Sequence, residues 1–320
     1  MIPRRTFIAA SLAAALPAQA QAWPSKPLKL VVPYAPGGTT DVIARMVAEY
    51  LGQRLGQNII VDNKPGKGAM VGTALVAKAP PDGYTLLMSV ISGLSISPTL
   101  YGGADFDPMA DFIHISIASR NPSVLVVNPN FKAKTFKEYI EIAKAEPGKL
   151  AYASAGPGTP YHLSVELFKT MTGTDLLHVP FKNSGDARNA VVGGHVQIML
   201  DAVTAMKPII DSGQVRALAT TGDKRSAVLP DVPTVSEAGV PGYEATLWLG
   251  IMAPTGTPKD VVERLNSEIS KTIAKPAIRE AWAKQGAVPM TMTSAQFETY
   301  LKGDIEKWAK VIKQAGIKAP

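Results

Sequence analysis

The sequence predicts an α/β protein of two domains with largely parallel sheets. Short apolar runs typical of buried strands alternate with helical patterns along most of the chain, which is the arrangement of βα units. A length of 320 residues with 46% hydrophobic residues is enough to build two buried cores. Two glycine-rich turns, at residues 33–41 and 155–160, each separate such a strand from an amphipathic helix.

The spacing of apolar residues predicts each element in turn. Residues 28–32 form a strand-like run, after which Ile43, Val47 and Leu51 recur at helical spacing and predict a helix packed on a sheet. Further strands are expected at residues 85–89, 124–127, 150–154, 196–200 and 216–220, and helices at residues 135–145, 259–273, 277–285 and 294–315. Two segments mark crossings between the domains, Asn121-Pro122 and Pro241-Gly242-Tyr243.

The N-terminal residues are typical of an export signal. Arg4 and Arg5 precede an apolar stretch at residues 7–16 and the small-x-small pattern at residues 20–22, so residues 1–22 are expected to be cleaved. The alternative is an anchor helix, but the apolar run is too short and Pro17 interrupts it. The paired arginines partly match a twin-arginine signal, which leaves the general secretory and twin-arginine routes both open. We therefore expect a soluble mature protein outside the cytoplasm.

Composition excludes several function classes. The formal charge of +7 falls to +5 when two arginines leave with the signal, and the remaining basic residues are scattered singly rather than gathered as in a nucleic-acid-binding patch. The absence of cysteine excludes thiol chemistry and thiolate metal sites. Histidines are not spaced as metal ligands, and no motif for a cofactor is present.

The two glycine-rich turns predict a clamp for an anion. A helix N-terminus presents unpaired N–H groups and the positive end of the helix dipole, and neither turn contains a lysine that grips phosphate. In the second turn Thr159 is placed to cap the helix, and its hydroxyl and the amides of Tyr161 and His162 are expected to hold a carboxylate. The alternative is an ordinary capped helix.

Some candidate residues admit more than one role. Gly37-Gly38 lets a ligand approach the backbone, but Asp41 competes with an anion, so it either caps inward or faces a ligand amine. Asp201 either faces the cleft or caps the helix that follows it, and His162 contacts the ligand, orients the turn or is a structural histidine. Residues expected at the carboxyl ends of strands, where ligands bind in such sheets, are Tyr34, Ser89, Ser92, Ala155, Asp201 and Thr221.

Enzyme signatures are absent from the sequence. It contains no Gly-x-Ser-x-Gly elbow, no Walker lysine, no His-Glu-x-x-His and no complete dinucleotide fingerprint. A triad of Ser154, His162 and Asp201 is the weaker alternative, because none of the three lies in a recognised nucleophile context.

Several motifs occur together in a fixed order. They are WPSKP at residues 23–27, VPYAPGGTTDVIAR at 32–45, VDNKPG at 61–66, APPDGYTLLM at 79–88, LAYASAGPGT at 150–159, HVPFK at 178–182 and LPDVPTVSEAG at 229–239. Through them, over essentially its whole mature length, the chain resembles the periplasmic solute-binding proteins of tripartite tricarboxylate transporters, the Bug family.

This resemblance implies a two-lobed Venus-flytrap fold of the type II class, with the ligand cleft between lobes formed by residues 23–121 plus 246–320 and by residues 122–245. It implies ligand contacts from the two turns and from the acidic residue after a strand, namely Tyr34, Gly38, Thr39, Asp41, Ala155, Gly156, Thr159, His162 and Asp201. The chain departs from many relatives at Lys182-Asn183-Ser184 and at Ala202, which bears on ligand identity more than on ligand class.

The leading interpretation is a monomeric periplasmic binding protein, without catalytic activity, cofactor or metal. It would capture a small mono-, di- or tricarboxylate and deliver it to membrane permease subunits. The alternatives are a sensor subunit that presents the same ligand to a signalling partner and, less favoured, a hydrolase that uses His162.

Overall fold

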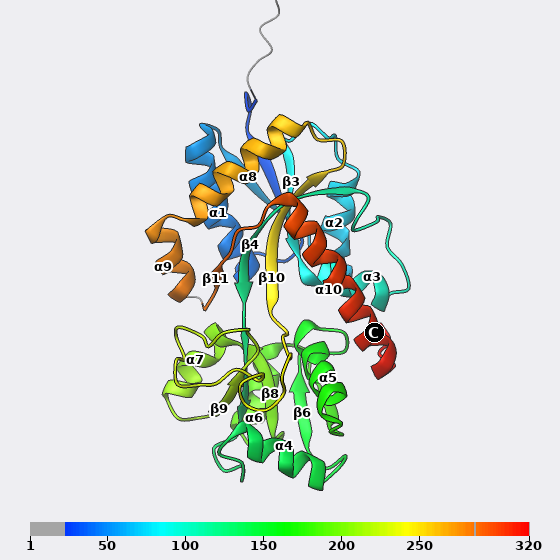
Figure 1. Cartoon of the computed structure of the whole chain (residues 1–320), viewed down its shortest axis with the longest axis vertical. Helices are drawn as coiled ribbons and strands as arrows, with labels where there is room; N and C mark the ends of the chain where they lie inside the picture. Colours follow the sequence, from blue (N-terminus) through cyan, green and yellow to red (C-terminus); the bar gives the residue numbers. More distant parts are fainter. Residues whose placement is uncertain (1–22, 285, 320) are drawn as a thin grey trace, which may run out of the picture.

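The computed structural model describes residues 23–284 and 286–319, so the predicted signal at residues 1–22 lies outside the described part. The chain forms two lobes, one above the other in Figure 1, each built around a sheet flanked by helices. The α/β class predicted from the sequence is confirmed.

The upper lobe holds a six-stranded sheet in the order β11-β4-β10-β3-β1-β2. Strand β1 pairs in parallel with β2 and β3, whereas β10 runs antiparallel to both β3 and β4. The strands are β1 (Leu28–Val32), β2 (Ile59–Asn63), β3 (Thr85–Val90), β4 (Phe112–Asn121), β10 (Leu247–Pro254) and β11 (Val288–Pro289).

The lower lobe holds a five-stranded sheet in the order β7-β6-β8-β5-β9. Its strands are β5 (Ser123–Val127), β6 (Ala151–Ser154), β7 (Leu177–Pro180), β8 (Ile198–Ala202) and β9 (Arg216–Thr220). Strand β6 is parallel to β7 and β8, but β5 is antiparallel to β8 and β9. Both sheets are therefore mixed, and the expectation of largely parallel sheets was wrong. The antiparallel pairs all involve β4, β5, β10 or β11. The apolar pattern predicted β5 as part of a βα unit, but β5 follows directly on the crossing from the other lobe and runs antiparallel to both of its neighbours.

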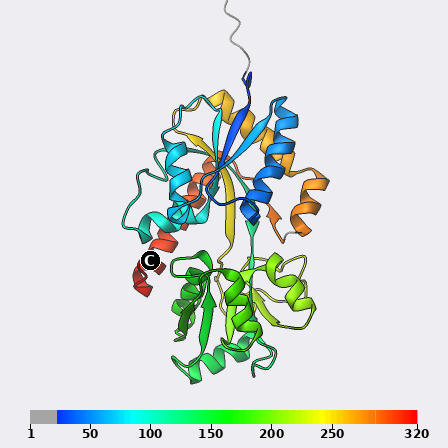
Figure 2. The same ribbon diagram turned by 180° about the vertical axis from the view of Figure 1, so that it is seen from behind.

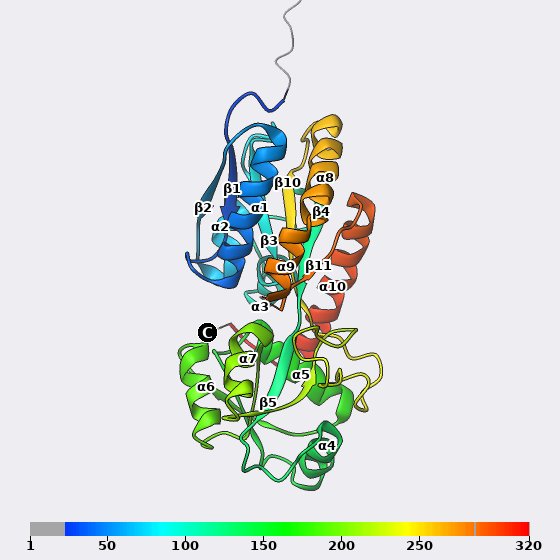
Figure 3. The same ribbon diagram turned by 90° about the vertical axis from the view of Figure 1, so that its left-hand side faces the viewer.

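Helices cover both faces of each sheet. In the upper lobe α1 and α8 lie side by side on one face, and α10 lies across the opposite face (Figure 3). The upper-lobe helices are α1 (Thr39–Leu55), α2 (Met70–Ala77), α3 (Ser97–Leu100), α8 (Lys259–Ile273), α9 (Pro276–Lys284) and α10 (Ser294–Ala315), and a π-helical turn, η2 (Ser92–Ile96), follows β3. The lower-lobe helices are α4 (Phe136–Ala145), α5 (Pro160–Thr172), α6 (Ser184–Val192) and α7 (Val203–Asp211).

The apolar spacing that predicted α1 also explains its packing. Ile43, Val47 and Leu51 are fully buried in one core cluster with residues of β1 and α8. Gly56 ends the helix with φ 69°, a left-handed conformation that glycine adopts at little cost. The predicted ranges for β1, β9, α8 and α10 are confirmed to the residue, and the other predicted elements differ at their ends by one or two residues.

Two crossings join the lobes. Strand β4 ends at Asn121 and β5 begins at Ser123, so only Pro122 separates a strand of one sheet from a strand of the other. Strand β10 brings the chain back at Leu247 (Figure 1). We propose on this basis that residues 122–245 form one domain and that residues 23–121 with 246–320 form the other.

Helix α10 connects the two lobes on the side away from α1. It packs on β4 and η2 in the upper lobe and on α5 in the lower one, and Figure 2 shows its C-terminal end beside the lower lobe. Asp304, buried in this helix, accepts hydrogen bonds from the indole N–H groups of Trp248 (2.9 Å) and Trp308 (3.0 Å). One continuous apolar cluster consequently includes residues of both lobes.

Candidate functional site

A cavity of about 480 Å³ lies between the two lobes, within the range of about 300–1,000 Å³ common for small-molecule sites. Three parts of the fold meet there: the start of α1 with the turn before it, the end of β3, and the start of α5 from the lower lobe, with β10 behind them. The lining residues are Tyr34, Ala35, Pro36, Gly38, Thr39, Thr40, Val90, Ile91, Ser92, Pro160, Tyr161, Leu247, Trp248 and Leu249.

A second, smaller space of about 70 Å³ adjoins it towards the crossing strands. Both spaces share Thr39, Thr40, Tyr161, Leu247 and Leu249. The remaining walls of the smaller one are Asn121, Pro122, Ala202, Val203, Thr204 and Gly286. None of the described residues that line either space is Lys, Arg, His, Asp or Glu, so side-chain hydroxyls, the Asn121 amide and backbone groups supply the polarity.

The start of α1 offers free donors at the edge of the cavity. Val42 donates the first backbone bond of the helix to Gly38 O (3.0 Å), so the amides of Thr39, Thr40 and Asp41 precede the first hydrogen-bonded turn. No side chain caps this end, and Gly38, the residue in the cap position, has no side chain. The predicted candidates Gly38 and Thr39 both line the cavity.

Asp41 turns away from the cavity into the lobe. Its carboxylate accepts hydrogen bonds from the Gly37 amide, Arg45 Nε and Asn63 Nδ2, each at 2.9 Å. Burial raises its pKa, but these hydrogen bonds and the charge of Arg45 outweigh that effect and hold the pKa at about 2. The carboxylate therefore faces into the lobe and holds the amide of Gly37 in the turn, not an amide of the helix, and Asp41 is not among the lining residues.

Tyr34 and Ser92 line the cavity together, as expected from their places after β1 and β3. The Tyr34 hydroxyl donates to Ser92 Oγ at 2.9 Å. Burial raises the pKa of Tyr34, only partly offset by this bond, so its phenol is neutral at physiological pH. The pair presents hydroxyl groups without adding charge. Ser89 is different, because its side chain is buried against Gly250 on the same face as Phe297 and does not reach the cavity.

The second turn contributes through the start of α5. Thr159 occupies the predicted cap position, but its hydroxyl donates to Gly156 O (2.8 Å) and makes no cap bond. Leu163 donates the first backbone bond to Thr159 O, so the amides of Tyr161 and His162 precede the hydrogen-bonded turn. Tyr161 lines the cavity, whereas Ala155, Gly156 and Thr159 are not among its lining residues.

His162 is buried behind the turn and not in the cavity. Its Nδ1 accepts a hydrogen bond from the Gly158 amide (2.9 Å), which ties the glycine-rich turn to α5. The ring of His178 stacks on it, and His178 Nε2 lies 2.6 Å from Ser154 Oγ. Among the three roles open to His162, the geometry agrees with orientation of the turn.

Asp201 lies behind the wall of the smaller space. Its Oδ1 accepts the Ala202 amide (2.7 Å), and its Oδ2 is 3.4 Å from Arg188 Nε. Burial raises its pKa, against the opposing effects of the Ala202 amide and Arg188. Ala202, not Asp201, occupies the cap position of α7. Asp201 is therefore neither a helix cap nor a lining residue in this conformation.

The alternative catalytic triad does not form. Ser154 is paired with His178, His162 accepts from a backbone amide, and Asp201 faces Arg188. Within residues 23–284 and 286–319, no cluster of three or more His, Cys, Asp or Glu side chains could hold a metal ion. No helix in the same ranges is long and apolar enough to cross a membrane.

The sequence analysis did not predict that the side chain of Tyr161 and residues 247–249 of β10 would line the cavity. Tyr161 follows Thr159 and Pro160 in the predicted turn, but only its amide was considered. Residues 247–249 lie just after the predicted crossing at Pro241-Gly242-Tyr243, and a strand that joins two lobes necessarily passes the space between them. The predicted crossing was therefore the feature of the sequence that could have placed residues 247–249 at the cavity.

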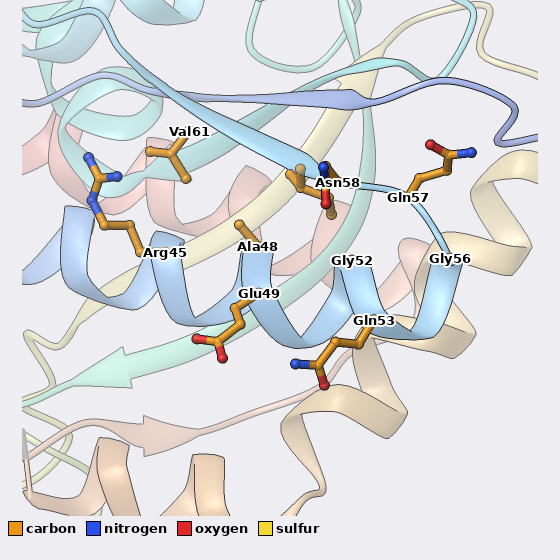
Figure 4. Close-up of a pocket in the computed structure, with 10 residues that line it drawn as sticks. Arg45, Ala48, Glu49, Gly52, Gln53, Gly56, Gln57, Asn58 and Val61 are labelled. Atoms are coloured by element: carbon orange, nitrogen blue, oxygen red, sulfur yellow. The ribbon is translucent and has the colours of Figure 1, made fainter.

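A larger groove, of about 750 Å³, lies elsewhere on the upper lobe, between α1 and the edge strand β2. Figure 4 shows Arg45 and Val61 on the strand side of α1, with Glu49 and Gln53 on the other side. The groove involves one lobe only, and long polar side chains line much of it. Although this groove is larger, the cavity between the lobes is the better candidate for the ligand site, because two helix N-termini meet there.

Comparison with protein families gives one match that spans most of the chain. A family model described as "Tripartite tricarboxylate transporter family receptor" matches residues 43–317. A protein in the tcbD-tcbE intergenic region of Pseudomonas sp. (strain P51) is 40% identical over 299 residues, covering 93% of this chain and 89% of the relative. Protein BugT of Bordetella pertussis is 38% identical over 317 residues, covering 98% and 96%.

Solved structures of family members are similar to this chain in both fold and sequence. R. palustris Rpa4515 with adipate has a TM-score of 0.79 and 34% identity, covering 92% of this chain and 99% of that one. MatC (Rpa3494) from Rhodopseudomonas palustris with bound malate has a TM-score of 0.75 and 30% identity, covering 91% and 100%. The structural neighbours are periplasmic binding proteins of two lobes, which confirms the predicted two-lobed fold, and they are not enzymes.

Proposed function

Because the chain belongs to the tripartite tricarboxylate transporter receptor family, we propose that it is a periplasmic solute-binding protein that captures a small carboxylate between its lobes. On this proposal it is exported and then presents the acid to the membrane permease subunits of a tripartite transporter. The printed ligands of two structural neighbours, adipate and malate, are both small carboxylates and support this assignment.

One observation carries the proposal: two helix N-termini from different lobes open on the same cavity, and side chains cap neither of them. The amides of Thr39 and Thr40 on one side and of Tyr161 on the other are placed to donate to a carboxylate. Each N-terminus contributes about half a positive charge. Such an arrangement binds an anion without any reacting group beside it.

Among the predicted site residues, Tyr34, Gly38, Thr39 and Ser92 are proposed to contact the ligand directly. Asp41 and His162 are proposed to hold the two turns in place, since both accept hydrogen bonds from the glycine-rich segments. Ala155, Gly156, Thr159 and Asp201 lie outside the cavity in this conformation, and any direct contact from them requires the lobes to close further. Ser89 is buried inside the upper lobe and is not proposed as a contact.

Mass spectrometry of small molecules released by denaturing freshly purified protein tests the proposal. We expect a small organic acid in an amount comparable to that of the protein. A Gly38→Val variant, purified in parallel, is the control, because a side chain at this position obstructs approach to the amides and should reduce the recovered acid. Recovery of a neutral or cationic compound in place of an acid would contradict the proposal.

A further inference from the structure

A group of linked ion pairs lies where the chain crosses between the lobes. Arg120, the second-last residue of β4, donates through Nη2 to Glu244 Oε1 (2.5 Å), and its Nη1 lies 3.3 Å from Asp223 Oδ2. Lys307 of α10 donates to Glu244 Oε2 at 3.2 Å, so two cations hold the carboxylate of Glu244. We call Arg120, Asp223, Glu244 and Lys307 the crossing network.

The ion pairs of the crossing network join residues of different lobes. Asp223 and Glu244 belong to residues 122–245, the proposed lower domain, whereas Arg120 and Lys307 belong to the proposed upper domain. A rotation of one lobe against the other therefore changes the distances between these charges. The crossing network is placed to oppose a rotation that separates them.

The surroundings of Glu244 make such a separation costly. The side chains of Arg120, Glu244 and Lys307 are only 14%, 26% and 28% exposed. Burial acts to raise the pKa of Glu244, but the charge of Lys307, a hydrogen bond from Thr246 and the charge of Arg120 outweigh it and hold the pKa below its ordinary value. A partly buried charge that loses its partners is left without compensation. Asp223 contributes less, because its side chain is 62% exposed and an exposed pair stabilises little.

The crossing network is also connected to the wall of the cavity. Lys307 Nζ lies 3.2 Å from Asp304 Oδ1, and Asp304 accepts the indole N–H of Trp248, which lines the cavity. Trp248 is in turn the residue of β10 that is paired with Arg120 of β4. The relative position of the lobes that the network holds is thus the one in which the starts of α1 and α5 open on the same cavity.

We infer that the crossing network limits how far the lobes open, and that Glu244 is its central residue. Without the charge of Glu244 the lobes sample wider openings, and a smaller fraction of molecules presents both helix starts to one acid. The apparent affinity falls in proportion to that fraction. The effect on affinity rests on the proposed function, whereas the limit on opening does not need a ligand.

Electron–electron double resonance on ligand-free protein, refolded from urea after dialysis, tests the limit on opening. The chain contains no cysteine, so Glu49→Cys on α1 and Asn189→Cys on α6 attach one spin label to an exposed position of each lobe. In this labelled protein Glu244→Gln should broaden the distribution of distances between the labels and shift it to longer values. Glu263→Gln, the same change in an exposed ion pair with Lys259 on α8, should leave the distribution unchanged. An unchanged distribution in folded Glu244→Gln overturns the inference.

A second variant keeps the test decisive if Glu244→Gln does not fold. Lys307→Met removes the other charge that faces Glu244 from α10 but keeps an apolar side chain of similar length, so packing changes little. It should also broaden the distribution towards longer distances. A distribution like that of the wild type in Lys307→Met overturns the inference.

Titration calorimetry tests the consequence for binding. The probes are hexanoate and adipate, which have six carbons each and carry one and two carboxylates. A probe that binds the wild type should bind Glu244→Gln at least about fivefold more weakly and Glu263→Gln equally well. Equal affinity in the wild type and Glu244→Gln would overturn the link between opening and binding. Failure of the proposed function is seen separately, as release of a compound that is not an acid, and does not alter the distances between the labels.

Discussion

His162 and His178 lie face to face, with ring centroids 4.0 Å apart and ring planes at 10°. His162 is buried in the lower lobe and His178 is partly exposed, and His162 is bonded to the glycine-rich turn that leads into α5. Burial, followed by the charges of His178 and Lys169, lowers the pKa of His162 to about 3, and burial also lowers the pKa of His178. Both rings are therefore neutral at physiological pH, and His162 can accept the Gly158 amide.

The first prediction is that the protein loses stability as the pH falls below about 6.5. The unfolded chain takes up a proton on His162 near its ordinary pKa of 6.5, but the folded chain does so only near 3. The contribution is fully present above 6.5 and is lost progressively between 6.5 and 3. By about pH 5 the loss is on the order of 2 kcal/mol.

Urea unfolding of the wild type and of His162→Gln, at about pH 7.5 and about pH 5, measures this loss. The variant should show a smaller decrease in the free energy of unfolding between the two values. His195→Gln, a change at an exposed histidine, serves as control and should behave like the wild type. An equal pH dependence in His162→Gln and the wild type would exclude His162 as the source.

A second prediction concerns Asp304, which accepts both indole N–H groups of Trp248 and Trp308. Asparagine has only one acceptor oxygen in this position, so Asp304→Asn leaves one buried N–H without a partner. We expect a loss of about 1–3 kcal/mol in the free energy of unfolding. Glu306→Gln, at an exposed position of the same helix, should stay within about 0.5 kcal/mol of the wild type. An equal loss of stability in both variants would contradict the claim that the two indole hydrogen bonds to Asp304 stabilise the fold.

Local patterns explain why much of the fold was predictable. Ile43, Val47 and Leu51 indicate both the helix and its buried face, because a helix on a sheet must hide one stripe of side chains. Strands β4 and β10 were missed. They carry serines and a glycine at positions buried against α10, where tertiary packing and not local composition decides the structure.

The site was predictable only in part, for a geometric reason. Tyr34, Gly38 and Thr39 follow one strand, so their convergence is local and visible in the sequence. Ser89 and Ser92 are close in sequence, but only Ser92 lines the cavity, because alternation along β3 directs the side chain of Ser89 into the lobe. That Tyr161 and Leu247 line the same cavity depends on how the two lobes sit against each other, which no local pattern specifies.

A third prediction separates the binding role of Gly38 from any role in folding. Its φ of −80° and ψ of 169° suit any residue, and a β-carbon there would meet nothing within 4 Å. Gly38→Val should therefore fold normally but weaken acid binding at least tenfold, or about 1.4 kcal/mol. Gly303→Val, on the exposed side of α10 and equally free of contacts, should bind like the wild type. Unchanged affinity in a folded Gly38→Val protein would remove the first turn from the site.

A fourth prediction is that a bound acid stabilises the protein and compacts it. Ligand that binds only the folded state should raise the free energy of unfolding by roughly 2.7 kcal/mol at a hundredfold excess over its dissociation constant. Because the cavity lies between lobes joined by β4 and β10, closure should also lower the radius of gyration in small-angle scattering. A rise in stability without compaction would indicate a site that is already closed before the ligand binds.

The last prediction concerns how the charge is recognised. If helix amides and hydroxyls hold the carboxylate, each charge-assisted hydrogen bond contributes about 1.5–3 kcal/mol. Hexanamide, which keeps the shape of hexanoate but not its charge, should then bind at least tenfold more weakly.

Since the described lining contains no basic side chain, raising the salt concentration from about 50 to about 500 mM should change the affinity for hexanoate less than about threefold. Calorimetry of the acid and of the amide at both salt concentrations measures both effects. Equal binding of acid and amide would mean that the two glycine-rich turns are ordinary helix starts, and a steep salt dependence would mean that an exposed cation outside the cavity binds the acid instead.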